Sequence, residues 1–129
     1  MKGKRKGHLS RREGQIMEAV YRLGEATVAD IAGQIPEEIG TSSISKFLWL
    51  LEEKGLVTHR RSGKRNVYRP ALPPEKASEK PLRNLMKTFF QGSASMTVVA
   101  LLNQSRNKLS EGEIDELFDL IKQFKEKGK

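Results

Sequence analysis

The sequence predicts a mainly α-helical protein with one small β-hairpin, divided into two parts by a proline-rich segment. Apolar residues recur at helical spacing along most of the chain, but between residues 56 and 69 the period changes from 3.6 to 2. Three prolines within residues 70–74 remove backbone donors and disfavour helix before each ring. We therefore expect an N-terminal domain over residues 9–72, a helical domain over residues 73–129, and a flexible basic tail over residues 1–8.

The first two helices are predicted from their ends. Ser10 and Glu13 have the spacing of a capping box, apolar residues follow at helical spacing, and Gly24 is expected to end the helix. Thr27 is expected to cap a short second helix. Pro36 prevents that helix from continuing, so it should be about two turns long.

A third helix and a hairpin complete the first domain. The helix should start near Thr41 or Ser42 and end at Lys54-Gly55, a basic last turn followed by a glycine. Residues 56–61 and 66–69 alternate as two strands, and residues 62–65 are expected to form the turn. From His59 to Arg69 there are five Lys or Arg residues and no acid, so the hairpin is strongly basic.

The second domain is predicted to be helical throughout. One apolar stripe ends at Gly92, Ser93 or Ser95 can open the next helix, and Ser110 with Glu113 has the spacing of another capping box. Pro81 predicts either a kink or the first turn of a new helix, and the pattern favours neither.

Composition limits the possible functions. The 129 residues carry 24 Lys+Arg and 16 Asp+Glu, a net charge of +8, which predicts a polyanionic partner. Residues 1–69 hold 14 basic and 8 acidic side chains, so the N-terminal half should face that partner. There is no cysteine and there are only two histidines, and no nucleophile, base and orienting residue occur as a set. We expect no metal, no cofactor and no enzyme activity.

The sequence also predicts a cytoplasmic protein that does not enter a membrane. The longest apolar runs have five residues, whereas a span needs roughly 20. The basic start is followed by Leu9-Ser10-Arg11-Arg12 rather than by an apolar stretch, so it is not a secretory signal.

Three helices followed by a two-stranded hairpin describe a winged helix-turn-helix, in which the third helix enters the major groove and the hairpin follows the DNA backbone. Small hydroxyl side chains at the start of the third helix can approach bases and phosphates, and hairpin cations can neutralise phosphates. The candidate DNA-binding residues are Thr41, Ser42, Ser43, Ser45, Lys46, Arg60, Arg61, Lys64, Arg65, Arg11 and Arg12.

Each candidate also has a simpler interpretation. A hydroxyl at a helix start is often only an N-cap, and a basic hairpin tip often only blocks strand pairing. Arg11 and Arg12, with the basic tail, form either a DNA-contacting arm or a solubilising segment. Trp49 is expected in the core or against a neighbouring helix, and His59 is expected to be an ordinary strand residue.

The apolar stripes of the second domain must be buried somewhere. Packing against a second copy of the chain would form a homodimer that reads two DNA half-sites, and packing within one chain would form a monomeric helical subdomain. We expect the homodimer. Its predicted contact residues are Leu85, Phe89, Phe90, Val99, Leu102, Ile114, Leu117, Phe118, Ile121 and Phe124.

Several ordered motifs resemble the penicillinase repressor family, which includes β-lactamase, methicillin-resistance and copper-responsive repressors. They are Leu9-Ser10-x-x-Glu13-x-x-Ile16-Met17, Ala26-Thr27-Val28, Ser42-Ser43-Ile44, Leu51-x-x-Lys54-Gly55-Leu56-Val57, Arg60-Arg61-x-Gly63-Lys64-Arg65, Val67-Tyr68-x-Pro70, Phe89-Phe90-x-Gly92 and Leu109-Ser110-x-x-Glu113-Ile114. The resemblance implies a homodimeric bacterial repressor that binds an inverted-repeat operator. It places Ser42, Ser43, Ser45 and Lys46 on the recognition helix and Lys64 and Arg65 on the wing.

The chain also departs from that family. Gly14 and Tyr21 stand where tryptophans are usual, and Leu50 stands where arginine is common. Antibiotic-responsive relatives are inactivated by cleavage of an Asn-Phe bond, which this chain lacks, and copper-responsive relatives use C-terminal cysteines, which it also lacks. We expect an inducing signal other than copper; a regulatory protease that cuts between Met96 and Asn103 is the alternative.

Two other functions compete with a DNA-binding repressor. One is a winged-helix module that binds a protein partner and has only non-specific affinity for nucleic acid. The other is a structure-specific RNA binder, which would respond to the 2′-hydroxyl.

Overall fold

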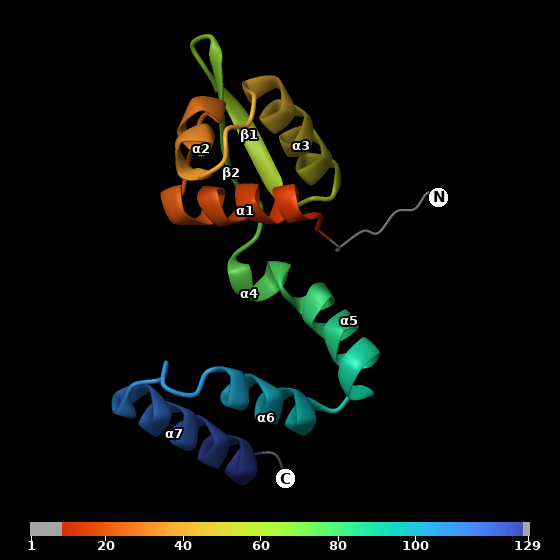
Figure 1. The fold of residues 1–129 in the computed structure, drawn as a ribbon, viewed down its shortest axis with the longest axis vertical. Helices are drawn as coiled ribbons and strands as arrows, with labels where there is room; N and C mark the ends of the chain where they lie inside the picture. Colours follow the sequence, from red (N-terminus) through yellow and green to blue (C-terminus); the bar gives the residue numbers. More distant parts are fainter. Residues whose placement is uncertain (1–8, 128–129) are drawn as a thin grey trace. The chain divides into compact units, whose positions relative to one another are not determined.

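The computed structural model describes residues 9–127 and divides into two compact units, Met1–Asn84 and Leu85–Lys129 (Figure 1). The predicted basic tail, residues 1–8, lies outside the described residues. The described part of the first unit contains three helices, a two-stranded antiparallel hairpin, a short fourth helix and the beginning of a fifth, and the described elements of the second unit are the end of that fifth helix and two further helices. The predicted fold class, mainly α with a hairpin wing, is confirmed.

Helix α1 spans Arg11–Leu23 and begins with the predicted capping box. The Ser10 amide donates to Oε1 of Glu13 at 2.9 Å, and the Glu13 amide donates to Oγ of Ser10 at 3.2 Å. Gly24 ends the helix at a φ of 82°, a conformation that a residue with a Cβ adopts only with strain. Both ends of α1 are therefore confirmed.

Helix α2, Val28–Gln34, begins at the predicted Thr27 cap. The cap is a second capping box: the Asp30 amide donates to Thr27 Oγ1 at 3.1 Å, and the Thr27 amide donates to Asp30 Oδ2 at 3.0 Å. Asp30 had no predicted role. These bonds and the Arg65 charge lower the pKa of Asp30, with the backbone bond from Thr27 as the largest cause.

Helix α3 spans Thr41–Glu53, as predicted. It is followed by β1, Val57–Ser62, and β2, Arg65–Pro70, which pair antiparallel with Ser62 opposite Arg65. The turn is therefore Gly63-Lys64 and not the four residues that the sequence predicted. Gly63 has a φ of 63°, which permits this tight connection and leaves Ser62 and Arg65 in the strands. At the other end of the hairpin, β1 begins one residue later and β2 ends one residue later than predicted.

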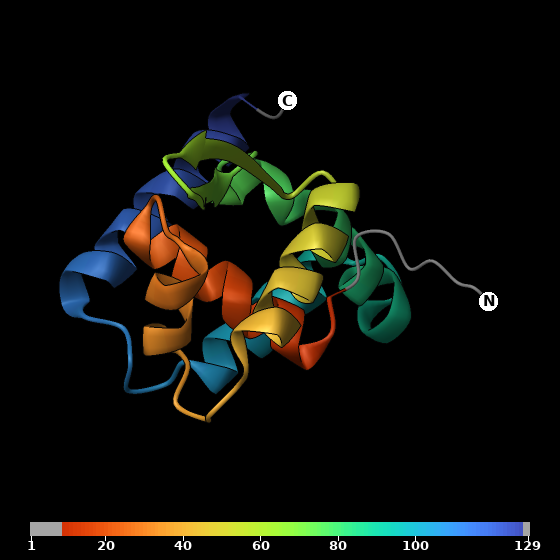
Figure 2. The same cartoon turned by 90° about the horizontal axis from the view of Figure 1, so that it is seen from above.

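The core lies where α1, α2, α3 and the base of the hairpin meet. Figures 1 and 2 show α2 and α3 side by side above α1, with the hairpin rising next to them. The loop between α1 and α2 also joins the hairpin, because Ala26 and Tyr68 exchange backbone hydrogen bonds of 2.9 and 2.8 Å. The buried residues are Ile16, Met17, Ala19, Val20, Ala26, Ile31, Ile35, Ile44, Leu48, Leu51, Val57 and Tyr68.

A largely buried ion pair fastens α1 to the end of α3. Lys54 Nζ lies 2.8 Å from Oε1 and 3.0 Å from Oε2 of Glu13, whose side chain is only 5% exposed. Burial alone raises the pKa of Glu13, but the hydrogen bonds from Lys54 and Ser10 and the Lys54 charge outweigh burial, so the pKa is lowered. Glu13 thus caps α1 and holds α3.

After the hairpin, α4 spans Pro74–Ala77 and α5 spans Glu79–Phe90, with a break at Ser78. Pro81 lies in the first turn of α5, which resolves the two alternatives in favour of a new helix. The Tyr21 hydroxyl donates to the Leu72 carbonyl at 2.9 Å and so ties the segment after β2 to α1.

The second unit continues with α6, Ala94–Gln104, and α7, Glu111–Lys127. Ser93, rather than Ser95, caps α6 by accepting from the Met96 amide at 3.0 Å. Ser110 and Glu113 form the predicted capping box before α7, with bonds of 2.9 and 3.1 Å. No residue of α5, α6 or the described length of α7 is buried.

Within residues 9–127, no helix on its own has the length and apolar character of a membrane span; Pro74–Phe90 and Ala94–Gln104 reach them only as a bent pair. The same residues contain no cluster of three or more His, Cys, Asp or Glu that could hold a metal ion.

Candidate nucleic-acid interface

One side of α3 is buried and the other is exposed and polar. Ile44, Leu48 and Leu51 have no exposed surface and hold the helix on the core. The five candidate residues of this helix are all exposed, and they are Thr41, Ser42, Ser43, Ser45 and Lys46. The packing of α3 therefore presents its predicted DNA-binding residues outwards.

The hydroxyl groups at the start of α3 do not cap the helix. Gly40 occupies the N-cap position, and no side chain makes a capping hydrogen bond there. Within residues 9–127, the hydroxyls of Thr41, Ser42, Ser43 and Ser45 make no hydrogen bond to the protein. The simpler interpretation of this cluster as N-caps is therefore wrong, and the hydroxyls are available to an external donor or acceptor.

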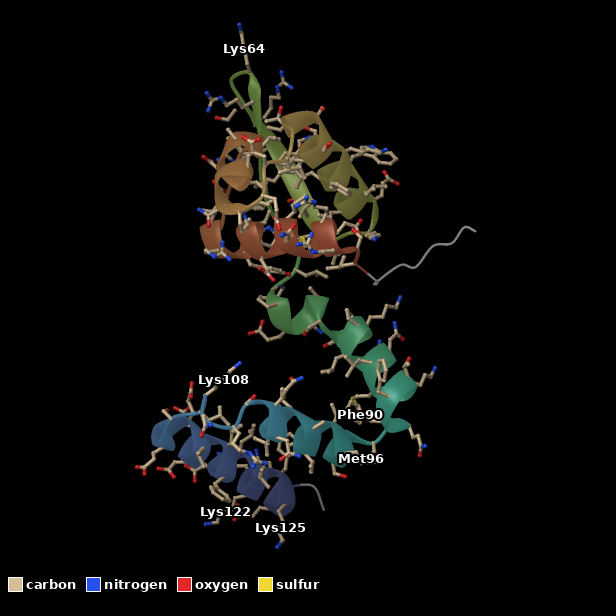
Figure 3. All side chains as sticks on the ribbon, viewed as in Figure 1. Lys64, Phe90, Met96, Lys108, Lys122 and Lys125 are labelled. Carbon is tan, nitrogen blue, oxygen red and sulfur yellow. The ribbon has the colours of Figure 1, made fainter. Side chains whose placement is uncertain are left out.

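The hairpin presents a cationic tip. Lys64 stands at the tip and points away from the rest of the unit (Figure 3), and Arg61 and Arg65 are exposed beside it. Arg65 is close enough to Asp30 to lower its pKa. Arg60 lies further from the tip and pairs with Glu25 at 3.0 Å.

Arg11 and Arg12, like Arg60 of the hairpin, have a carboxylate partner in the chain. The guanidinium groups of Arg11 and Arg12 and the Gln15 amide converge on Glu37, at 2.9, 3.3 and 3.0 Å respectively. The hydrogen bond from Gln15, a backbone hydrogen bond and the bond from Arg11 lower the pKa of Glu37 to about 2. This cluster joins the start of α1 to the loop before α3.

His59 lies on β1 and reaches back to α3. Its Nδ1 is 2.8 Å from Oε1 of Glu52, and its ring lies 5.4 Å from the Tyr68 ring, measured between centroids. His59 thus supports the junction between α3 and the hairpin.

Trp49 is not in the core, contrary to the sequence expectation: it is 60% exposed. The apolar side of α3 is fully formed by Ile44, Leu48 and Leu51, and Trp49 follows Leu48 by roughly 100° around the helix axis. The helical spacing of the sequence already leaves Trp49 off the apolar side of α3, and this angle is the signal that indicates its exposure.

The residues predicted for dimerisation are exposed or only partly buried in the single chain. Phe89 and Phe124 are each 71% exposed and Phe118 is 68% exposed, while Phe90 is half-buried. Where α5 meets α6, a hollow of about 330 Å³ is lined by Phe90, Met96 and Val99, and Figure 3 marks the first two.

Helices α1, α2 and α3 with the antiparallel hairpin, and the polar face of α3 beside a cationic tip, define a winged helix-turn-helix regulator of transcription. Residues 9–123 match the sequence profile of the penicillinase repressor family. The penicillinase repressor of Bacillus licheniformis is 22% identical over 123 residues, which are 94% of each chain. The chain therefore belongs to the penicillinase repressor family.

The chain is also similar to solved structures, and the fold it shares with the first of these is the winged helix. M. tuberculosis Rv0081 aligns with a TM-score of 0.50 at 19% identity, over 78% of this chain and 86% of its own. An ArsR family transcriptional regulator aligns with a TM-score of 0.48 at 21% identity, over 62% of this chain and 79% of its own. Family membership makes this chain a DNA-binding transcriptional repressor and not an enzyme.

Proposed function

We propose that the repressor acts as a homodimer on an inverted-repeat operator, with α3 in the major groove and the hairpin along the DNA backbone. The observation that carries the proposal is the exposed face of α3, where hydroxyl groups have no partner among the described residues and serve no capping role. Such groups donate to and accept from both base edges and phosphates.

The hairpin supplies the sequence-independent part of the binding. Arg61, Lys64 and Arg65 lie at or beside a tip that protrudes from the unit. Cations in this position neutralise phosphates and release counterions, which makes affinity depend on salt. Arg11, Arg12 and Arg60 contribute less in this proposal, because each already has a carboxylate partner.

The second unit supplies the dimer. Its described helices bury no residue of their own although α6 and α7 carry large apolar side chains, including Leu101, Phe118 and Ile121. Helices with apolar faces are stable when another surface covers those faces, and a second copy offers the same faces by symmetry. The hollow at the α5–α6 corner offers space for a side chain of the partner.

Binding to two kinds of duplex across a salt series tests this proposal. One duplex contains an inverted repeat from upstream of the repressor's own gene, and the other has the same composition in scrambled order. We expect selective binding of the inverted repeat with a stoichiometry of two chains. Equal, purely salt-controlled binding to both would overturn the proposal and favour a protein-binding module with non-specific nucleic-acid affinity.

The wing is tested by the double variant Lys64→Ala, Arg65→Ala. The matched control is Arg83→Ala, Lys87→Ala, which removes two exposed cations from α5. If both wing cations of both protomers contact phosphates, the slope of log K against log salt falls by roughly 0.9 per contact, about 3.6 in all. A wing variant with the slope of the control would show that the wing does not touch the backbone.

We further propose that the inducing signal is not copper, because the chain contains no cysteine. A regulatory protease acting on Met96–Asn103 would have to cut within α6, which is helical throughout that stretch. Mass analysis of the repressor from induced cells distinguishes the two routes: an intact chain supports a bound signal, and a fragment cut in α6 supports proteolysis.

A further inference from the structure

We propose that Trp49 is a specificity-determining residue, whose indole packs against a thymine methyl group in the major groove of each operator half-site. The inference deepens the proposed function and rests on it. Trp49 lies on α3 and is 60% exposed, whereas the sequence expectation placed it in the core or against a neighbouring helix.

Helix geometry places Trp49 on the polar face of α3. At roughly 100° per residue, Trp49 lies about 20° from Ser42, 40° from Ser45 and 60° from Lys46 around the axis. It lies at least about 100° from the buried Ile44, Leu48 and Leu51. The indole therefore continues the stripe formed by the candidate DNA-binding residues.

The stripe is short enough to fit the groove. Seven residues separate Ser42 from Trp49, which is about 10.5 Å along the helix axis, whereas the major groove is about 12 Å wide. A helix that lies along the groove with Ser42 at the bases therefore keeps Trp49 within the groove. Glu53 follows one turn later on the same side, and its carboxylate would be repelled by phosphates, so the DNA-facing stripe ends at Trp49.

The surroundings of Trp49 favour DNA over a protein partner. The other large apolar side chains of α3, which is described in full, are buried or half-buried, so Trp49 does not belong to an apolar patch. Protein-binding hot spots cluster with other apolar anchors. Here the neighbours on the same face are hydroxyls and a lysine on the N-terminal side of Trp49 and Glu53 on its C-terminal side, all of them polar. The apolar group that B-DNA offers in its major groove is the thymine methyl.

Trp49 is the single tryptophan of the chain, so its fluorescence reports on this residue alone. In the wild-type protein, we expect the inverted-repeat duplex to change the emission and to protect the indole from acrylamide. At the same salt concentration, a scrambled duplex should protect it less. An indole that stays as accessible in the specific complex as in the free protein would overturn the inference while leaving the proposed function intact.

Removing the methyl group tests the thymine contact directly. Each thymine of a half-site is replaced in turn by deoxyuridine, symmetrically in both halves, so that only the C5-methyl group is lost. At one position we expect the wild-type affinity to fall about fourfold per half-site, the value for burying one methyl-sized group. Trp49→Ala should bind the thymine and uracil duplexes equally well at that position, and Trp49→Phe should keep part of the discrimination.

Leu23→Ala is the matched control, because Leu23 is an exposed apolar residue of the same unit that lies outside α3. It should retain the full response to deoxyuridine. If Trp49→Ala also loses affinity when thymine is replaced by deoxyuridine, the proposed thymine contact is overturned, whatever the fluorescence shows. If the wild-type protein does not bind the inverted-repeat duplex selectively, the proposed function itself is overturned.

Discussion

The two units of the repressor have similar apolar helical stripes but bury them to very different extents. In the first unit, the stripes of α1, α2 and α3 meet one another and the hairpin, and seven large side chains are almost completely buried. In the second, which begins within α5, no described residue of α5, α6 or α7 is buried. The difference shows that amphipathic periodicity predicts a face that needs a partner, and not whether the same chain supplies that partner.

The largest expected effect comes from charging the uncovered face. Phe118→Asp with Ile121→Asp places four carboxylates in a dimer interface and removes four apolar side chains from it. Each buried apolar side chain contributes about 1.5–3 kcal/mol, so dimerisation should weaken by about 6 kcal/mol or more. Sedimentation against concentration measures this, and the fold of the first unit should persist.

Gln123→Asp is the matched control for that experiment, because residue 123 lies on the side of α7 opposite Ile114. It should leave the dimer unchanged. If the wild-type chain is monomeric at all concentrations, the second unit is a monomeric subdomain and the proposed dimer is wrong.

The next largest effect is expected on the free energy of unfolding, from a substitution in the core of the first unit. Leu48→Ala removes a side chain with no exposed surface and should lower the free energy of unfolding by about 2–5 kcal/mol. Urea unfolding followed by circular dichroism measures the loss. Phe124→Ala, at a 71% exposed position, should cost less than about 0.5 kcal/mol in a monomeric background. Equal losses of unfolding free energy in Leu48→Ala and Phe124→Ala would contradict the difference in burial between the two units.

The ion pair between Glu13 and Lys54 should have an intermediate effect. Glu13→Gln removes the charge that holds α3 and should cost about 1–3 kcal/mol of unfolding free energy. The pKa of Glu13 is lowered by folding, so its stabilising contribution is full above the ordinary value of 4.5 and is lost as pH falls through the lower, folded value. Wild-type stability should therefore decline below about pH 4.5 more steeply than that of the variant; parallel curves would contradict this role.

The smallest expected effects come from removing the same capping motif from each of the two units. Thr27→Ala removes the cap of α2 and should lower the unfolding free energy of the first unit by about 1 kcal/mol. Ser110→Ala removes the equivalent cap of α7, and its cost should appear as weaker dimerisation rather than as lower stability of the first unit. Unfolding and sedimentation measured on both variants separate the two outcomes.

Local patterns predicted much of the fold, and contacts between distant residues account for the rest. The capping boxes at Ser10 and Ser110 have their partners three residues away, so the sequence shows them directly. The convergence on Glu37 could not be predicted, because Arg11 is 26 positions from Glu37 and no short pattern joins them. The turn at Gly63-Lys64 was also missed, because Ser62 and Arg65 suit a strand as well as a turn.

The sequence predicted which side of α3 carries the polar candidate residues, but it did not predict that Trp49 is exposed on that side. Ser42, Ser43, Ser45 and Lys46 are exposed as expected, since the apolar period fixed the opposite face of α3. Trp49 was expected in the core or against a neighbouring helix, although its angular position on α3 is away from the apolar side, and it is exposed. Whether these residues contact DNA stays a prediction that the binding experiments test.

The exchange of hydrogen bonds between Ala26 and Tyr68 has a mechanical consequence for the hairpin. It gives the base of the hairpin a third hydrogen-bonded segment, while the outer part, up to Gly63-Lys64, remains a two-stranded ribbon, a form that is only marginally stable by itself. The base of the hairpin is thus held by more hydrogen bonds than its outer end, so the outer end should bend more easily. If Lys64 contacts the DNA backbone as proposed, bending confined to this outer end would let it follow the path of the strand without transmitting strain to α3.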